Sequence, residues 1–247
     1  MDAKRFEEIR NNIVGAKRVR QGIGTLQEKT VHAVLKDYYA PDKDMQEIRV
    51  SGYVADIYTG GEIIEIQTSN FHTLRGKLDA FLPNYPVTLV YPIPKIKYLI
   101  WMDEETGKCS KPRKSNAKGS VYRAFYELYK IKPYLSDENL HLCFPLLELE
   151  EYRLLNGWSR DRKRGSQRFD RIPAALLGEV RIDDISDYAQ LIPEGIEEPF
   201  TVQEFGKAVG QQRKIVAKVI HVLHYLHVIE RCENRGRAYT YRTVKKG

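Results

Sequence analysis

The sequence predicts an α/β protein with a mixed sheet, joined to a smaller C-terminal domain. One observation behind this fold class is the order of hydrophobic patterns in the N-terminal part, which run helix, strand, strand, strand, helix, strand. Another is a polar, basic stretch at residues 157–166, after which helical and hairpin patterns return. These patterns predict an N-terminal domain at 1–155, a basic linker at 156–173 and a C-terminal domain at 174–247.

The elements of the N-terminal domain follow from the spacing of its apolar residues. Residues 25–39 place Val31, Val34 and Leu35 on one face, which predicts a helix. The later segments are short, rich in β-branched residues and separated by turn signals, and Pro92 ends one of them. Strands are expected at 47–50, 53–58, 62–68, 87–91 and 98–102, a second helix at 71–82, and a basic loop at 108–118.

Composition excludes several classes of protein. The chain has 247 residues, of which 42% are hydrophobic and 30% charged, as expected for a globular protein. No segment approaches the roughly 20 apolar residues of a membrane helix, and the charged N-terminus lacks the apolar core of a signal peptide. Three cysteines without a CxxC pair argue against a structural zinc site and indicate a reducing compartment. We therefore expect a cytoplasmic protein with no membrane partner.

Positive charge is concentrated towards the C-terminus. The formal net charge is +7. From residue 156 onwards there are 17 Lys and Arg against 12 Asp and Glu, which accounts for five of these seven charges. This distribution favours a polyanionic partner, although a solvated basic surface without a partner would have the same composition.

A possible hairpin carries the clearest chemical signal. Gly60-Gly61 lies between two β-rich segments, and two glycines suit a two-residue turn because both can adopt positive φ. With that loop, Asp56 lies directly opposite Glu65 on one face of the sheet. Two opposed carboxylates repel each other, so a proton, a basic neighbour or a metal ion must compensate. Mg²⁺ prefers such ligands, which makes the pair a candidate seat for phosphodiester chemistry.

Two alternatives remain open for this hairpin. A three-residue loop would shift the register by one and put Asp56 on the opposite face from Glu65. The two carboxylates could also be solvated side chains of an exposed hairpin. The flanking Ile63, Ile64 and Ile66 favour a strand that is covered on both faces.

Asp56, followed by Glu65-Ile66-Gln67 in a hairpin after one helix, resembles the PD-(D/E)xK, or restriction-endonuclease-like, nuclease superfamily. That superfamily has an α-β-β-β-α-β core, and the resemblance covers about residues 25–91. It implies that Asp56 and Glu65 hold Mg²⁺ (or Mn²⁺ as a substitute), that Gln67 positions the attacking water, and that Glu28 on the first helix supports the metal. Gln67 departs from the usual Lys and cannot supply a charge.

Three neighbouring residues have weaker signals. Glu28 and His32 lie four apart on one helical face, where a salt bridge is a plainer account than a zinc site without a third ligand. Arg75 and Lys77, on the helix after the hairpin, are candidates for phosphate contacts, but a solvated helix face accounts for them equally well.

The C-terminal segment has its own ordered pattern. Thr201 and Glu204 have the spacing of a capping box that opens a short helix, and residues 212–228 form a longer amphipathic pattern followed by a β-hairpin. With a first helix at 183–192, this order resembles a winged helix-turn-helix domain. The resemblance implies DNA contacts from the recognition helix and the wing. The expected contact residues are Arg213, Lys214, Lys218, Arg235 and Arg237.

Together these features predict a Mg²⁺-dependent DNA endonuclease that a winged helix positions on DNA. Cutting both strands usually requires two active sites, which makes a homodimer an expected assembly. Because Gln67 replaces Lys, a non-catalytic DNA-binding regulator with a nuclease-like scaffold is the alternative. A third hypothesis is an interaction protein in which both domains bind other proteins.

Overall fold

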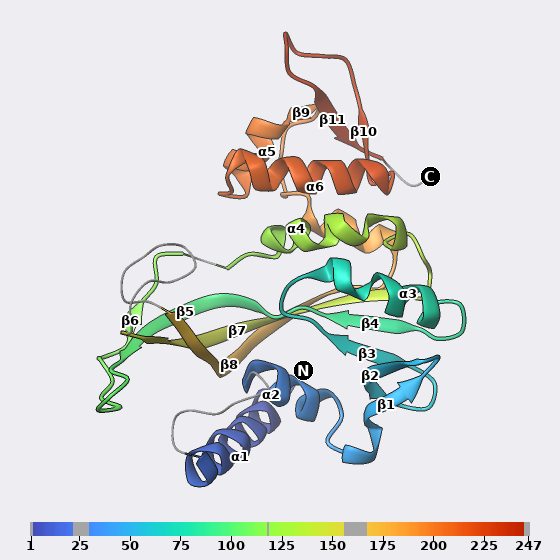
Figure 1. Cartoon of the computed structure of the whole chain (residues 1–247). Coiled ribbons are helices and arrows are strands. Elements are labelled where there is room, and N and C mark those ends of the chain that lie inside the picture. Colours follow the sequence, from blue (N-terminus) through green and yellow to red (C-terminus); the bar gives the residue numbers. More distant parts are fainter. Residues whose placement is uncertain (1, 22–29, 118, 156–166, 245–247) are drawn as a thin grey trace.

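A large mixed sheet forms the centre of the molecule in the computed structural model, which describes residues 2–21, 30–117, 119–155 and 167–244 (Figure 1). The strand order is β1-β2-β3-β4-β7-β5-β6, and β8 pairs with β7. β1 to β3 are antiparallel neighbours, whereas β3, β4 and β7 run parallel. The strands are β1 (Gln46–Val50), β2 (Tyr53–Tyr58), β3 (Ile63–Ile66), β4 (Val87–Val90), β5 (Ile93–Met102), β6 (Arg113–Lys114), β7 (Leu140–Leu154) and β8 (Gln167–Ile182).

Helices cover both faces of this sheet (Figure 1). α1 and α2 lie on one face, where Phe6, Val34 and Leu35 pack against Ile57 and Ile66. α3, α4 and the neighbouring 3₁₀ turns lie on the other face. The helical segments are α1 (Ala3–Gln21), α2 (Thr30–Tyr39), η1 (Lys43–Met45), η2 (Phe71–Leu74), α3 (Arg75–Phe81), η3 (Val121–Ala124), α4 (Phe125–Leu128) and η4 (Tyr129–Tyr134).

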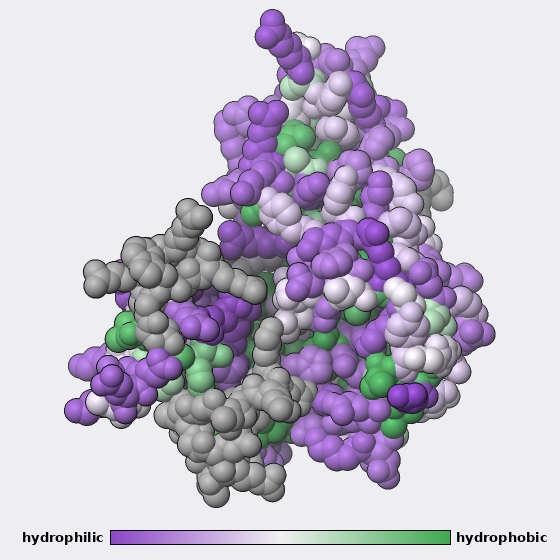
Figure 2. Space-filling view, viewed as in Figure 1, coloured by the Kyte–Doolittle hydropathy of each residue, from purple (hydrophilic) through white to green (hydrophobic). Residues whose placement is uncertain are grey.

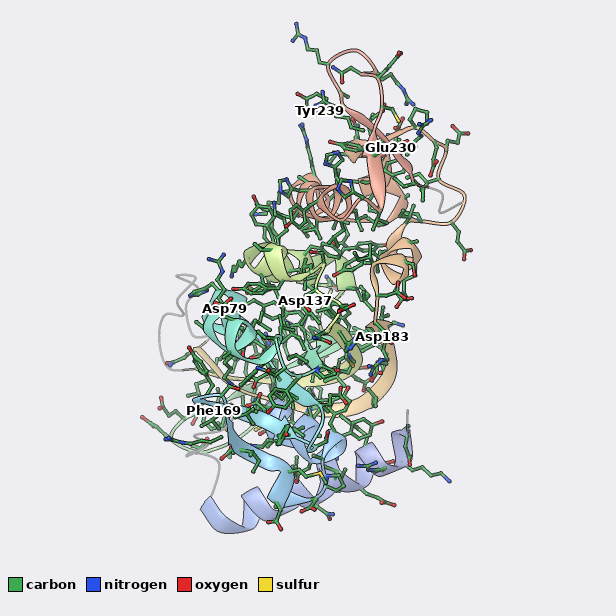
Figure 3. The ribbon with its side chains drawn as sticks, turned by 90° about the vertical axis from the view of Figure 1, so that its right-hand side faces the viewer. Asp79, Asp137, Phe169, Asp183, Glu230 and Tyr239 are labelled. Atoms are coloured by element: carbon green, nitrogen blue, oxygen red, sulfur yellow. The ribbon has the colours of Figure 1, made fainter. Side chains whose placement is uncertain are left out.

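The C-terminal domain rests on α4 and continues the same hydrophobic core (Figure 1). Side chains fill the space between α4 and α6 (Figure 3), and Phe205 and Val216 belong to the core cluster that contains Phe125. Its small sheet has the order β10-β11-β9, and the hairpin that carries Tyr239 projects away from the large sheet (Figure 3). The elements are η5 (Ile185–Leu191), β9 (Phe200–Thr201), α5 (Val202–Ala208), α6 (Arg213–Tyr225), β10 (Ile229–Arg231) and β11 (Thr240–Thr243).

The sequence predicted the mixed α/β class correctly, together with the order from α2 to β4. The expected capping box is present, because Thr201 accepts from the Glu204 N–H and Glu204 accepts from the Thr201 N–H. Three expectations were wrong. Residues 167–173, expected as linker, form the first part of β8, which continues to Ile182, beyond the expected domain start at 174. The basic loop contains β6, and the helix expected at 183–192 is a 3₁₀ segment.

The sequence analysis also missed several elements. α1 was not expected, and neither was β7, which pairs with β4 and β5 on one side and β8 on the other. Together β5, β7 and β8 form an arm that extends beyond the short strands (Figure 1). Among the described residues, no helix has the length and apolar character needed to cross a membrane.

Candidate functional site

A two-residue turn sets the register of the β2–β3 hairpin. Tyr58 pairs with Ile63, and the Thr59 N–H donates to the Glu62 carbonyl oxygen at 3.0 Å. Gly60 in the turn has φ +92°, a value that favours glycine. The expected two-residue loop is therefore present, and the pairing continues to Ile57 and Ile64.

Asp56 and Glu65 lie at the point where this backbone pairing ends. The Asp56 N–H donates to Oε1 of Glu65 at 3.2 Å, and the Ile66 N–H donates to Oδ2 of Asp56 at 2.8 Å. Beyond Ile57 and Ile64 the two strands separate. Here the carboxylates, rather than backbone carbonyl oxygens, accept the hydrogen bonds of the Asp56 and Ile66 N–H groups. The result is a pair of carboxylates held side by side, as the sequence predicted.

Basic side chains approach the pair from two helices. Nζ of Lys77 on α3 lies 2.7 Å from Oε2 of Glu65, and Nε2 of His32 on α2 lies 3.2 Å from Oδ2 of Asp56. The Glu65 side chain is 4% exposed, whereas those of Asp56 and His32 are each 21% exposed and that of Lys77 is 24% exposed. A solvent-borne ligand can therefore reach three of the four groups.

The environment drives the two carboxylates towards different protonation states. Burial, together with the charge of Asp56, raises the pKa of Glu65 to about 7, although Lys77 acts in the opposite direction. Burial also acts to raise the pKa of Asp56. The hydrogen bond and charge of His32, with the Ile66 N–H, outweigh it and hold that pKa below its usual value. Near neutral pH, Asp56 is ionised and Glu65 is poised to gain or lose a proton.

A hard divalent cation fits this donor set. Mg²⁺ commonly binds one or two carboxylates and completes its shell with water and phosphate oxygens. A cation beside Glu65 would stabilise the ionised form that burial and Asp56 disfavour. A site made of protein ligands alone does not fit, because no group of three His, Cys, Asp or Glu side chains able to hold a metal occurs among the described residues. Glu28, the expected supporting carboxylate, lies outside the described residues.

Comparison with known proteins places this region in a family. Residues 29–183 match the model of a family described as a domain of unknown function (DUF8091), which covers more than half of the chain. The chain belongs to the DUF8091 family. The matched segment contains the Asp56–Glu65 pair and ends directly after β8, whereas the C-terminal domain lies outside it.

The chain is also similar to an uncharacterized protein of Treponema pallidum (strain Nichols). The two are 31% identical over 150 residues, which is 60% of this chain and 59% of the relative. The chain thus spans less than two thirds of that protein's length. No solved structure matches the chain.

The remaining expected residues around the pair have different environments. Gln67 follows β3, is half-buried, and its Nε2 lies 3.5 Å from Oγ1 of Thr73. Arg75, considered for phosphate contact, instead donates from Nε to the Lys130 carbonyl oxygen at 2.9 Å. The sequence analysis treated Lys77 as equally consistent with a solvated helix face, but it is the cation beside Glu65.

The expected DNA-contacting residues of the C-terminal domain divide into two groups. Arg213 and Lys214 at the start of α6, and Arg237 in the hairpin, are exposed. Nζ of Lys218 instead lies 3.5 Å from the ring centroid of Tyr129 on η4. Arg235 folds back, with Nη1 2.6 Å from Oε1 of Glu204 and Nη2 2.6 Å from the Pro199 carbonyl oxygen. Figure 2 shows a mainly hydrophilic surface over this domain.

Sequence reasoning missed the role of His32 and Lys77 at the carboxylate pair. His32 had been considered only as a partner of Glu28, and Lys77 only as a phosphate contact or part of a solvated helix face. One sequence feature could have indicated this role. Buried opposed carboxylates are stabilised by nearby cations, and the helices on either side of the hairpin contain these basic residues. Which of the nearby cations reached the pair depended on how the helices pack.

Proposed function

We propose that this chain is a divalent-metal-dependent DNA endonuclease of the PD-(D/E)xK type, with a C-terminal winged helix that positions the duplex. The observation that carries the proposal is the Asp56–Glu65 pair, held at the end of the β2–β3 pairing with Lys77 2.7 Å from Glu65. A carboxylate whose pKa is raised by burial and by a specific charged neighbour, at a site that solvent reaches, is a candidate functional group.

The order of elements supports the same proposal. The run α2-β1-β2-β3-α3-β4 has the α-β-β-β-α-β order of that superfamily, with an antiparallel β1–β3 meander and β4 parallel to β3. Asp56 lies on the second strand and Glu65 on the third, which are the positions that the resemblance assigns to the metal ligands.

The chain's own groups suggest a division of roles. Asp56 and Glu65 would hold the metal, which when bound would polarise a phosphate oxygen and lower the pKa of a water molecule. Lys77 would supply the positive charge that Gln67 lacks, because its ammonium group already lies at Glu65 and is partly exposed. Gln67 would orient a water molecule through its amide. His32 would keep Asp56 ionised and in place.

The C-terminal domain contributes the proposed DNA-binding module. Its elements follow the order β9-α5-α6-β10-β11, with β11 between β10 and β9, as in a winged helix. The exposed Arg213 and Lys214 lie at the N-terminal end of α6, the end of a recognition helix that usually meets base edges. Arg237 would contact phosphate from the wing. Cutting both strands would require a second copy of the chain.

Cleavage of supercoiled plasmid and of branched DNA tests the proposal. Wild type should cut with Mg²⁺ or Mn²⁺ but not in EDTA, and both Asp56→Asn and Glu65→Gln should abolish cutting. Lys77→Met should lower the rate by about 10²–10³-fold, as expected for losing a preorganised charge at the reacting group. Glu105→Gln, an exposed carboxylate in a loop, is the matched control and should cut like wild type.

The alternative is the non-catalytic DNA-binding regulator. Gln67 in place of Lys is the observation that favours it. No cutting with either metal ion, together with DNA binding that is equal in EDTA and Mg²⁺, would replace the nuclease proposal by this one. DNA cutting that survives in the Asp56→Asn/Glu65→Gln double variant would refute the assignment of the site.

A further inference from the structure

A second charged cluster lies on the β5–β7–β8 arm, away from the carboxylate pair. At its centre is Glu151 on β7, whose side chain is 0% exposed. Oε1 of Glu151 accepts from Nε and Nη2 of Arg153 at 2.8 and 2.5 Å. Oε2 accepts from Nε of Arg171 at 3.2 Å and from Nζ of Lys97 at 3.4 Å, and Nε of Arg168 lies 3.9 Å away. We call these five residues the Glu151 cluster.

The Glu151 cluster has a surplus of positive charge. One carboxylate faces four cationic side chains. Within the part of the chain that the structure describes, Lys97, Arg153 and Arg171 make no ion pair with any other carboxylate. Burial lowers the pKa of Lys97, and the charges of Arg171 and Arg153 lower it further. Repulsion among these cations falls when an external anion binds between them.

The geometry also leaves donors available for such an anion. Nε of Arg171 donates to Glu151. Among the described residues, the two Nη groups of Arg171 make no hydrogen bond to protein. The side chains of Arg153, Arg171 and Arg168 are 23%, 29% and 54% exposed, respectively. Glu151 fixes guanidinium groups that would otherwise be flexible, and a fixed planar fork suits the paired oxygens of a phosphate. Phosphate binding is therefore the chemistry that this cluster fits best.

We propose that the Glu151 cluster binds the phosphate backbone of duplex DNA, as a second DNA-binding surface distinct from the Asp56–Glu65 pair and the C-terminal domain. The proposal rests on the proposed function for its choice of DNA as the polyanion. Glu65 is in register with Leu142 of β7 through β4, and Glu151 lies nine residues further along β7. At ~3.3 Å per residue this is at most about 30 Å, or about nine base pairs of duplex. The cluster would thus hold DNA within about nine base pairs of the cleaved bond.

Salt-dependent binding of a labelled 30-base-pair duplex in EDTA tests this site without relying on cleavage. The slope of log affinity against log salt falls by about 0.9 for each phosphate that the protein no longer neutralises. Arg168→Gln/Arg171→Gln should therefore lower the slope by about 2, and the most exposed single change, Arg168→Gln, by about 1. Arg181→Gln is the matched control, since Arg181 lies on the same strand but faces Glu179 and Asp183 and should leave the slope unchanged.

Each result decides the proposal. A wild-type slope in the Arg168→Gln variant would overturn it. The Tm of each variant shows whether the proteins compared are folded. An equally lowered slope in Arg181→Gln would also overturn it, because the effect would then be one of general charge. If the arginine variants lower the slope but wild type never cuts DNA, the phosphate-binding site at the Glu151 cluster stands and only the nuclease proposal is rejected.

Discussion

Replacing Glu65 by glutamine should remove most of the pH dependence of stability that the metal-free protein has between about pH 5 and about pH 8. Glu65 has a pKa raised to about 7 in the folded state, against an ordinary value of 4.5, first because it is buried and then because Asp56 lies beside it. A carboxyl group with a raised folded pKa stabilises the folded state while it is protonated. That contribution is complete below pH 4.5 and is lost as the pH rises through about 7.

The magnitude follows from the size of this rise. The pKa of Glu65 rises from 4.5 to about 7. At roughly 1.4 kcal/mol for each pKa unit, the free energy involved is about 3–4 kcal/mol, most of it lost between about pH 5 and about pH 8. Because the Glu65 side chain is only 4% exposed, solvent screening reduces this little. Glutamine keeps the shape but cannot ionise. The ion pair with Lys77 is already included in this net rise, because Lys77 acts to lower the pKa of Glu65.

Urea unfolding in EDTA at several pH values measures this difference. The free energy of unfolding of wild type should fall by about 2–3 kcal/mol relative to Glu65→Gln as the pH rises, and Glu105→Gln should follow wild type. Mg²⁺ added near pH 8 should restore stability to wild type and not to Glu65→Gln, because the ion favours the ionised carboxylate. If Glu65→Gln has the same pH dependence as wild type, the buried-carboxylate reasoning is wrong.

Two further predictions concern folding of the two domains. Thr201→Ala should lower the free energy of unfolding by about 1 kcal/mol, because the Thr201 hydroxyl accepts a hydrogen bond from the Glu204 N–H at the start of α5. Urea unfolding measures this loss, and a wild-type midpoint would mean that the cap contributes nothing. Gly119→Ala should cost about 1–3 kcal/mol, because an added Cβ would lie 2.1 Å from the Pro94 carbonyl oxygen; a Tm equal to that of wild type would show that this segment shifts freely.

The sequence predicted features that depend on short stretches of chain. The β2–β3 hairpin needed only Gly60-Gly61 and the alternation around it, and the Thr201–Glu204 cap needed only its own spacing. The long strands were harder to predict. β7 is buried almost throughout its first half, so its apolar run has no alternation, and β8 begins in a polar, basic stretch that resembled linker. Their pairing joins segments whose connection includes residues 156–166, and local patterns contain no information about it.

The site shows the same division between local and long-range information. Asp56 and Glu65 face each other because a turn of two residues fixes their register, and one residue more would have separated them. Lys77 and His32 reach the pair only because α3 and α2 pack near the β2–β3 hairpin, which no spacing in the sequence records. Yet a requirement for compensation was predictable. Two opposed carboxylates repel each other, so the hairpin pattern implied compensation by a proton, a basic neighbour or a metal ion, without saying which. The proposed division of roles makes the same point: Lys77 on α3 would supply the positive charge that Gln67 on the strand side does not.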